Sequence, residues 1–336
     1  MMAVMHQQIN LYYHTLRIRF TAPKHIKMNC WFGAVLRNRF LKAADNILDN
    51  DGTSLRLLLN RLPLPENHFL YNRLNGGFPK AFLFKFDNIN PDIDGFILEA
   101  NRIYYINLII IGDFCRYVDL FSQAIDLMFS QGFGHPITPL SLIDICEESS
   151  ENYIYSHGKT FGHLSNPIRL EGIGEVFENQ RDNKFTQLQI KFLTPTSLIS
   201  KPGKIETIGY QSRLNNFPSL YQIMRSACYR IATLSMLYCD SNIYNSESEM
   251  DEAIEDYLSS ITQAILLNAS ISWQRCYSTP RKNGATYQLW GYTGQLLFDN
   301  TPYYYMPILY FMQSLAIGND INYGLGAYSI RYRFEE

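Results

Sequence analysis

The chain has 336 residues, 46% of them hydrophobic and 18% charged, and a net charge of −2, which excludes a disordered or collagen-like protein. Its apolar runs, such as residues 106–112, are too short to cross a bilayer, and its first ten residues lack the pattern of a signal peptide. Six scattered cysteines without a C-x-x-C pair indicate neither a zinc site nor a disulfide framework, so we expect reduced thiols in the cytoplasm.

The charge is unevenly distributed along the chain. Residues 1–45 carry seven Lys and Arg against one acid, whereas residues 247–256 carry six acids and no base. A basic end on a nearly neutral protein can bind phosphates through a local patch. The alternative is a solvated helix face, and the sequence leaves both interpretations open.

The first half of the chain has the predicted order strand, helix, strand, strand, helix, strand. Alternating apolar residues predict the strands and helical spacing predicts the helices. The ranges are 10–20, 28–47, 81–86, 95–112, 114–130 and 137–145. Residues 49–80, rich in Asn, Pro and Gly, read as an insert, and a glycine turn at 132–134 precedes the last strand.

A polar connector follows, and the same order then restarts. The predicted elements are a strand at 184–193, a helix at 217–239, a helix ending near Leu266, strands at 270–278 and 286–298, a helix at 303–316 and a strand at 327–334. The loop before the last strand contains Gly318, Gly324 and Gly326. Such glycines permit positive φ and let another backbone come close.

Two β-α-β-β-α-β units in series predict an α+β fold of tandem ferredoxin-like (RRM-like) domains. The expected division is an N-terminal domain at 1–148 with an insert at about 49–80, a connector at 149–183, and a C-terminal domain at 184–336.

The C-terminal motifs resemble those of the CRISPR repeat-RNA (pre-crRNA) processing endoribonucleases of the RAMP superfamily. Phe192-Leu-Thr-Pro-Thr-Ser-Leu198 is similar to that family's strand-to-turn signature, Trp273-Gln-Arg-Cys-Tyr-Ser278 to its arginine-and-serine strand, and Gly291-Tyr-Thr-Gly294 to its hairpin return. Residues 318–326 resemble its glycine-rich loop. In the first half, the likeness is looser and involves residues 31–37 and 132–134.

The resemblance implies RNA bound along the groove between two ferredoxin-like domains and cut without a metal or cofactor. A ribose 2′-hydroxyl attacks its own 3′ phosphate, leaving a 2′,3′-cyclic phosphate and a 5′-hydroxyl. This chemistry needs a base, an acid and a cation near the phosphate.

Family members usually place a histidine in or beside the first helix, and residues 28–46 contain none. His25 with Lys27 is therefore the first candidate for base and cation. His68, His157 and His163 are the competing candidates. His14 lies on the same side of its strand as the apolar Leu16 and is expected in the core.

The predicted RNA contacts combine cations with aromatic residues, which pair with phosphates and stack on bases. They are Arg37, Arg275, Arg281, Lys282, Gly318, Gly324, Gly326 and Arg331. For Trp273 and Trp290, a place in the core is the favoured interpretation.

The leading hypothesis is an endoribonuclease that matures CRISPR RNA and keeps its product. The alternative is a non-catalytic RNA-binding RAMP subunit of a CRISPR effector complex. The absence of a histidine from the first helix favours this alternative. Either hypothesis implies repeat RNA or crRNA as a partner, with other effector subunits as further partners. A ferredoxin-like interaction protein with no role in RNA is the third possibility.

Overall fold

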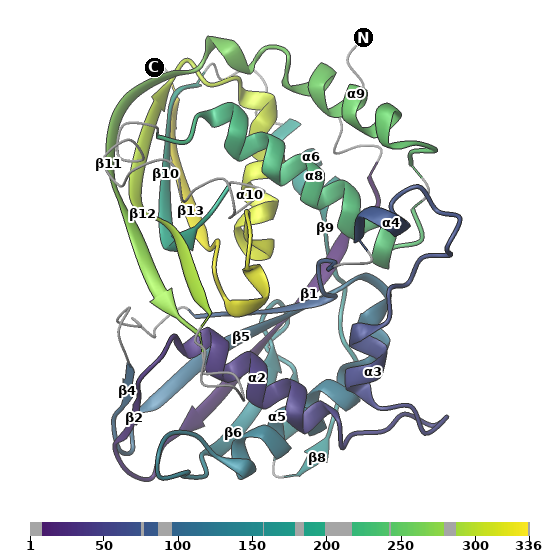
Figure 1. Cartoon of the computed structure of the whole chain (residues 1–336), viewed down its shortest axis with the longest axis vertical. Helices are drawn as coiled ribbons and strands as arrows, with labels where there is room; N and C mark the ends of the chain where they lie inside the picture. The colour runs from purple at the N-terminus through teal and green to yellow at the C-terminus, as the bar shows by residue number, and fades with distance from the viewer. Residues whose placement is uncertain are drawn as a thin grey trace.

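The computed structural model describes residues 9–74, 77–86, 96–156, 158–178, 185–198, 217–241, 243–278 and 287–334. The chain folds into two lobes, each built on one antiparallel sheet, with the N-terminal lobe below and the C-terminal lobe above in Figure 1. No helix in these ranges is long and apolar enough to cross a membrane.

The N-terminal sheet has the ferredoxin-like strand order. Its central path is β3 (Phe82–Lys85), β5 (Ile103–Ile111), β1 (Tyr12–Thr21) and β6 (Ser141–Glu147). Even-numbered residues of β1, such as Leu16, Ile18 and Phe20, point to the face covered by α2 (Phe32–Ala44) and α5 (Val118–Gln131). α5 ends at Gly132, whose φ of 80° is reached most readily by glycine.

The C-terminal sheet repeats this order with β11 (Ile265–Tyr277), β12 (Gln288–Asp299), β10 (Phe185–Thr196) and β13 (Tyr328–Phe334). α8 (Leu220–Tyr238) and α10 (Met306–Leu315) pack on its inner face. Ser219 and Gln222 begin α8 with a capping box, in which each side chain accepts a hydrogen bond from the other residue's backbone N–H. The two sheets confirm the tandem ferredoxin-like fold.

Shorter elements fill the insert and the edges of the two sheets. The insert contains the helices α3 (Leu55–Asn60) and α4 (Tyr71–Leu74). Strand β2 (Ile26–Met28) pairs with β4 (Phe96–Leu98) in a separate two-stranded sheet. Helix α9 (Glu247–Leu258) precedes β11.

The segment predicted as a connector contributes to both lobes. β7 (Tyr153–Ser156) pairs with β6 and with β8 (Lys159–Thr160), and β9 (Ile168–Arg169) pairs with β1. α6 (Leu170–Glu178) lies against the C-terminal lobe, where the rings of Phe177 and Tyr310 are 5.7 Å apart. The segment thus joins the two lobes by packing as well as by sequence.

The lobes share one hydrophobic core rather than facing each other across an open groove. Odd-numbered residues of the N-terminal sheet, including Tyr13, Ile109 and Ile111, belong to the same buried cluster as α8 and α10. The rings of Tyr13 and Phe311 are 5.1 Å apart in an edge-to-face contact. Along this part of the seam, side chains fill the expected groove.

One element boundary differs from the prediction. The acidic helix α9 ends at Leu258, and Ile265 and Leu266, expected to end a helix, begin β11 instead. They pair with Asp299 and Phe298 of β12. The tertiary pairing decides the state of this short apolar run, for which helix and strand cannot be distinguished from sequence.

Candidate functional site

The glycine-rich loop, residues 317–326, joins α10 to β13 and packs on the chain's own backbone. Gly318 and Gly326 have φ of 90° and 78°, and a Cβ on Gly318 would lie 2.4 Å from the carbonyl oxygen of Ser197. The N–H of Asn319 donates to Ser197 (2.8 Å), and the N–H of Gly326 donates to Pro195 (3.1 Å). The backbone that approaches these glycines is therefore the end of β10.

The first turn of α2 docks on the same loop from the other lobe. A Cβ on Gly33 would lie 1.9 Å from the carbonyl oxygen of Tyr323, and the Nε1–H of Trp31 donates to that oxygen at 2.5 Å. The Trp31 backbone N–H donates to Tyr277 of β11 at 2.8 Å. The loop, the β11–β12 hairpin and helix α2 thus meet at one junction. We call it the loop junction, defined by Trp31, Gly33, Tyr277, Tyr323 and Gly324.

Arg37 of α2 lies beside the loop junction, and its charge acts on Lys80. The Arg37 guanidinium is 4.8 Å from the centre of the Tyr323 ring, and its buried Nε has no hydrogen-bond partner among the described residues. Lys80 precedes β3, with its Nζ 3.7 Å from the centre of the Phe78 ring. Burial, and then the charge of Arg37, lower the pKa of Lys80 to about 8.

Lys80 is a residue that sequence reasoning missed. Lys80 stands at the end of the insert, where it belongs to no sequence motif and to no alternating or helical pattern of residues. The charge of Arg37, a residue distant in sequence, acts on Lys80 in the folded chain, so no signal in the sequence identifies Lys80.

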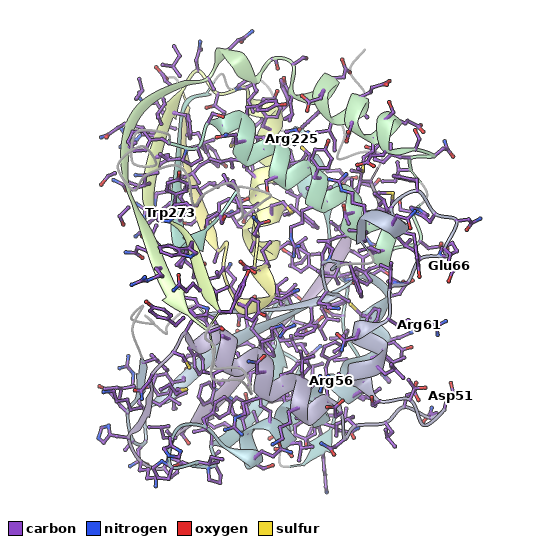
Figure 2. All side chains as sticks on the ribbon, in the orientation of Figure 1. Asp51, Arg56, Arg61, Glu66, Arg225 and Trp273 are labelled. Carbon is purple, nitrogen blue, oxygen red and sulfur yellow. The ribbon has the colours of Figure 1, made fainter. Side chains whose placement is uncertain are left out.

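The hairpin places Arg275 between aromatic rings. Its guanidinium lies 5.0 Å from the Tyr277 ring centre and 5.3 Å from that of Trp290. Trp273, labelled in Figure 2, is 7% exposed and packs 4.6 Å from Tyr292, as expected of a core residue. Arg281 and Lys282, the other predicted contacts of this hairpin, lie outside the described residues.

The remaining predicted RNA contacts are divided between the loop junction and strand β13 of the C-terminal sheet. Gly324 packs at the junction, where a Cβ would lie 2.6 Å from the Phe86 ring. Arg331 is exposed on the edge strand β13, in register with Gln189 of β10. The structure therefore groups Arg37 with the glycines and leaves Arg331 on β13.

The two predicted catalytic residues lie apart from the glycine loop. His25 is exposed immediately before β2, and Lys27 is exposed within it. Strands β2 and β4 occupy a lower corner of the molecule in Figure 1, whereas the glycine loop lies near its centre.

The other histidines have varied environments. His68 stacks on Phe69 at 4.7 Å, and its Nδ1 accepts from the Leu70 N–H, while burial lowers its pKa. His163 is exposed in a loop, and His157 lies outside the described residues. His14 is buried with its Nδ1 2.7 Å from a Glu147 carboxylate oxygen, which confirms its expected place in the core.

One acidic residue, Asp320, belongs to the glycine loop. Asp320, in the glycine loop, has a raised pKa because burial disfavours its charged form. Within the described ranges, no group of three or more His, Cys, Asp or Glu side chains could hold a metal ion. Arg37 is the cation that contacts the ring of Tyr323 in this loop.

Residues 190–328 match the family model for CRISPR-associated endoribonuclease Cas6. This range contains the second half of β10, the hairpin and the glycine loop. No curated protein matches the chain.

Solved structures resemble the whole chain in fold. In a partial Cas6-RT-Cas1–Cas2 complex, one chain aligns with a TM-score of 0.60 and 10% identity, over 98% of this chain and 47% of that one. A second Cas6-RT-Cas1–Cas2 complex gives the same score and identity, with 30% of its chain covered. A Cas6 product complex aligns with a TM-score of 0.48 and 15% identity, over 95% of this chain and 100% of that one.

The chain spans less than half of the length of the first two of these structures. At such identities, the similarity concerns the fold. The family match covers residues 190–328, and the fold of the whole chain is similar to that of a chain in a partial Cas6-RT-Cas1–Cas2 complex.

Proposed function

We propose that this protein is an endoribonuclease that cuts CRISPR repeat RNA to mature crRNA. The observation that carries the proposal is the coincidence of two features. The Cas6 family match covers the hairpin and glycine loop, and these are the elements that dock on α2 beside Arg37.

The proposed reaction needs no metal or cofactor. A base takes the proton of a ribose 2′-hydroxyl, the 2′-oxygen forms a bond to the adjacent phosphorus, and the bond from phosphorus to the 5′-oxygen breaks. An acid returns a proton to that 5′-oxygen. The products are a 2′,3′-cyclic phosphate and a 5′-hydroxyl, so atoms and charge balance without water.

His25 is the first candidate for the base and Lys27 for the neighbouring cation. Both side chains are exposed and therefore accessible to RNA without rearrangement of the core. His25 precedes the helix whose first turn forms the loop junction, so an RNA bound at the rim of the seam could extend toward it.

The RNA path in this proposal follows the rim of the seam. Arg37 beside Tyr323 would pair with phosphates at the junction, and Arg275 between Tyr277 and Trp290 would hold the strand along the hairpin. Arg281, Lys282 and Arg331 are proposed to extend this surface. Two solved structures that are similar to this chain in fold are Cas6-RT-Cas1–Cas2 complexes, so CRISPR protein partners are proposed as well.

A second candidate function is a non-catalytic RNA-binding subunit of an effector complex. The placement of His25 in a corner away from the glycine loop favours it, because a base must reach the 2′-oxygen of the RNA held there. Under this alternative the cations and aromatics of the rim keep their binding role.

Incubation with the repeat RNA of its own CRISPR array in EDTA distinguishes these functions. Cleavage that leaves a 2′,3′-cyclic phosphate is the expected result, whereas tight binding without cleavage would favour the subunit. Absence of both would overturn both proposals. His25→Ala should slow cleavage by about 10²–10⁴-fold. An unchanged rate would exclude His25, and His163→Ala and His68→Ala then test the other candidates.

A further inference from the structure

We propose that the partly exposed end of the N-terminal sheet binds the repeat RNA between the loop junction and His25, through Arg17, Lys85 and Tyr105. The two cations would pair with phosphates, and the Tyr105 ring would stack on a base. This inference rests on the proposed endoribonuclease function and deepens it, because it gives the RNA a path from the glycine loop to the candidate base. The three contact residues lie outside the matched range 190–328, so the family match assigns them no role.

The face of the N-terminal sheet that packs on α8 and α10 becomes accessible toward the C-terminal end of β1. Tyr13, at the start of this face, is 3% exposed and belongs to the shared core. Arg17, Arg19 and Thr21 continue the same face and are only partly buried, whereas the residues between them are buried on the other face. Ile103 of β5, in register with Thr21, is 47% exposed. The C-terminal lobe therefore leaves this end of the sheet accessible to a ligand.

The strand register brings the proposed contacts side by side. Asn107 of β5 is in register with Lys85 of β3 on one side and with Arg17 of β1 on the other. Tyr105 is in register with Arg19 in the next row of the same face. Opposite residues of an antiparallel pair have Cβ atoms about 4.5–5.5 Å apart, and alternate strands lie about 10 Å apart. We call this surface the sheet platform, defined by Arg17, Arg19, Lys85, Tyr105 and Asn107.

Two cations of the sheet platform have charge available for a ligand. Arg19 is neutralised by the buried Asp144, which accepts from its Nε at 2.7 Å and from its Nη2. Arg17 has a looser contact, because its Nη2 is 3.9 Å from the exposed carboxylate of Glu151, and its buried Nε has no hydrogen-bond partner among the described residues. No ion pair to Lys85 occurs within the described ranges. A phosphate would give Arg17 and Lys85 the charged partner that Arg19 already has.

Cations beside an aromatic ring on a sheet face suit single-stranded RNA. Unpaired bases stack on aromatic side chains, and four-stranded sheets of this topology present such rings to RNA. Tyr105 lies on β5, which is next to β1 in the middle of the sheet. Arginine and lysine beside the ring can pair with the backbone phosphates of the same strand. The ligand that fits the sheet platform is therefore an unpaired segment of the repeat RNA.

The sheet platform connects two parts of the candidate site that lie apart. At one end, Lys85 is followed by Phe86, whose ring would be 2.6 Å from a Cβ on Gly324 of the glycine loop. At the other end, β1 ends at Thr21, and His25 follows four residues later. Four residues span at most about 14 Å, which limits the distance between the end of β1 and His25. RNA on this face can therefore extend from the loop junction toward the candidate base.

The test measures affinity for a repeat RNA that carries a 2′-deoxynucleotide at the mapped cleavage site and cannot be cut. Tyr105→Ala should raise Kd by about 5–150-fold, the range for loss of one stacked base. Tyr105→Phe keeps the ring and should recover most of the affinity. Arg17→Met and Lys85→Met should each reduce the slope of log K against log salt by about 0.7, the value of one lost phosphate contact on a single strand.

The matched controls are Tyr310→Ala, which removes a 47% exposed ring from α10, and Arg61→Met, which removes an exposed charge at the edge of the molecule (Figure 2). Neither should change the affinity or the slope. Wild-type affinity in Tyr105→Ala, or wild-type slopes in Arg17→Met and Lys85→Met, would overturn the proposal. Equal melting temperatures exclude a loss of folding, and if Tyr105→Ala melts early, the slopes of the two cation variants decide.

Cleavage of unmodified repeat RNA separates this inference from the proposed function. For Tyr105→Ala, the single-turnover rate should fall at subsaturating protein by the same factor as the affinity and recover at saturating protein. If the wild type cleaves and the variants bind and cleave like it, the nuclease proposal stands and the sheet platform is wrong. If the wild type does not cleave, the unmodified RNA serves in the binding test. A reduced slope in Arg17→Met and Lys85→Met then supports the sheet platform while the nuclease proposal fails.

Discussion

At the scale of single residues, the loop junction requires a residue without a Cβ atom at position 33. Gly33 lies in the first turn of α2, where any side chain would meet the backbone of Tyr323. Gly172 in α6 has open space around its Cβ position. The two helical glycines therefore provide a matched pair, in which one position must be glycine and the other need not be.

Gly33→Ala should destabilise the protein by about 2–3 kcal/mol, because the clash is with backbone and not with a flexible side chain. Gly172→Ala should leave the stability unchanged or raise it by up to about 1 kcal/mol through helix propensity. Urea unfolding of both variants measures this difference. If Gly33→Ala proves neutral, α2 and the glycine loop do not touch as described.

At the scale of elements, β1 is fixed to the end of β6 by a buried pair. His14 contacts Glu147, and the same carboxylate accepts hydrogen bonds from the Ser150 hydroxyl (2.7 Å) and the Ser165 N–H (2.9 Å). Burial alone would raise the pKa of Glu147, but these hydrogen bonds outweigh it and hold the pKa below its ordinary value.

A carboxylate with a lowered pKa contributes stability above its unfolded-state pKa, and this contribution is lost as pH falls through the folded-state value. The free energy of unfolding should therefore decrease below about pH 4.5. Glu147→Ala should cost about 3–5 kcal/mol at pH 7, since it leaves polar groups buried without a partner, and should weaken the acid dependence.

Glu151→Ala serves as the control, because that side chain is 81% exposed and its contact with Arg17 is 3.9 Å. Its effect should stay within about 0.5 kcal/mol. A loss from Glu147→Ala no larger than this would show that the buried pair does not hold β1 and β6 together.

At the scale of the whole molecule, the shared core should make the two lobes unfold together. α8 and α10 are covered on one side by their own sheet and on the other by residues of β1 and β5. A fragment of residues 184–336 would expose side chains such as Phe311 and Met312, which are 1% and 0% exposed in the full chain.

Heating the intact protein should give a single transition by both circular dichroism and tyrosine fluorescence. The fragment 184–336 should not show a cooperative transition of its own, because its exposed apolar surface lacks a partner. Independent cooperative folding of the fragment would support the proposed division into 1–148, 149–183 and 184–336 as autonomous domains. Two separate transitions in the intact chain would contradict a shared core.

The sequence by itself determined the repeated order of strands and helices, because alternation and helical spacing are local properties of segments such as β1 and α8. It also indicated the positive-φ glycines of the loop, since few other residues adopt that backbone conformation. Only the tertiary structure decided which backbone those glycines admit, that Ile265 begins a strand, and that Arg37 lies against the Tyr323 ring. These depend on contacts between residues distant in sequence, and neither periodicity nor composition encodes the distance between two such side chains.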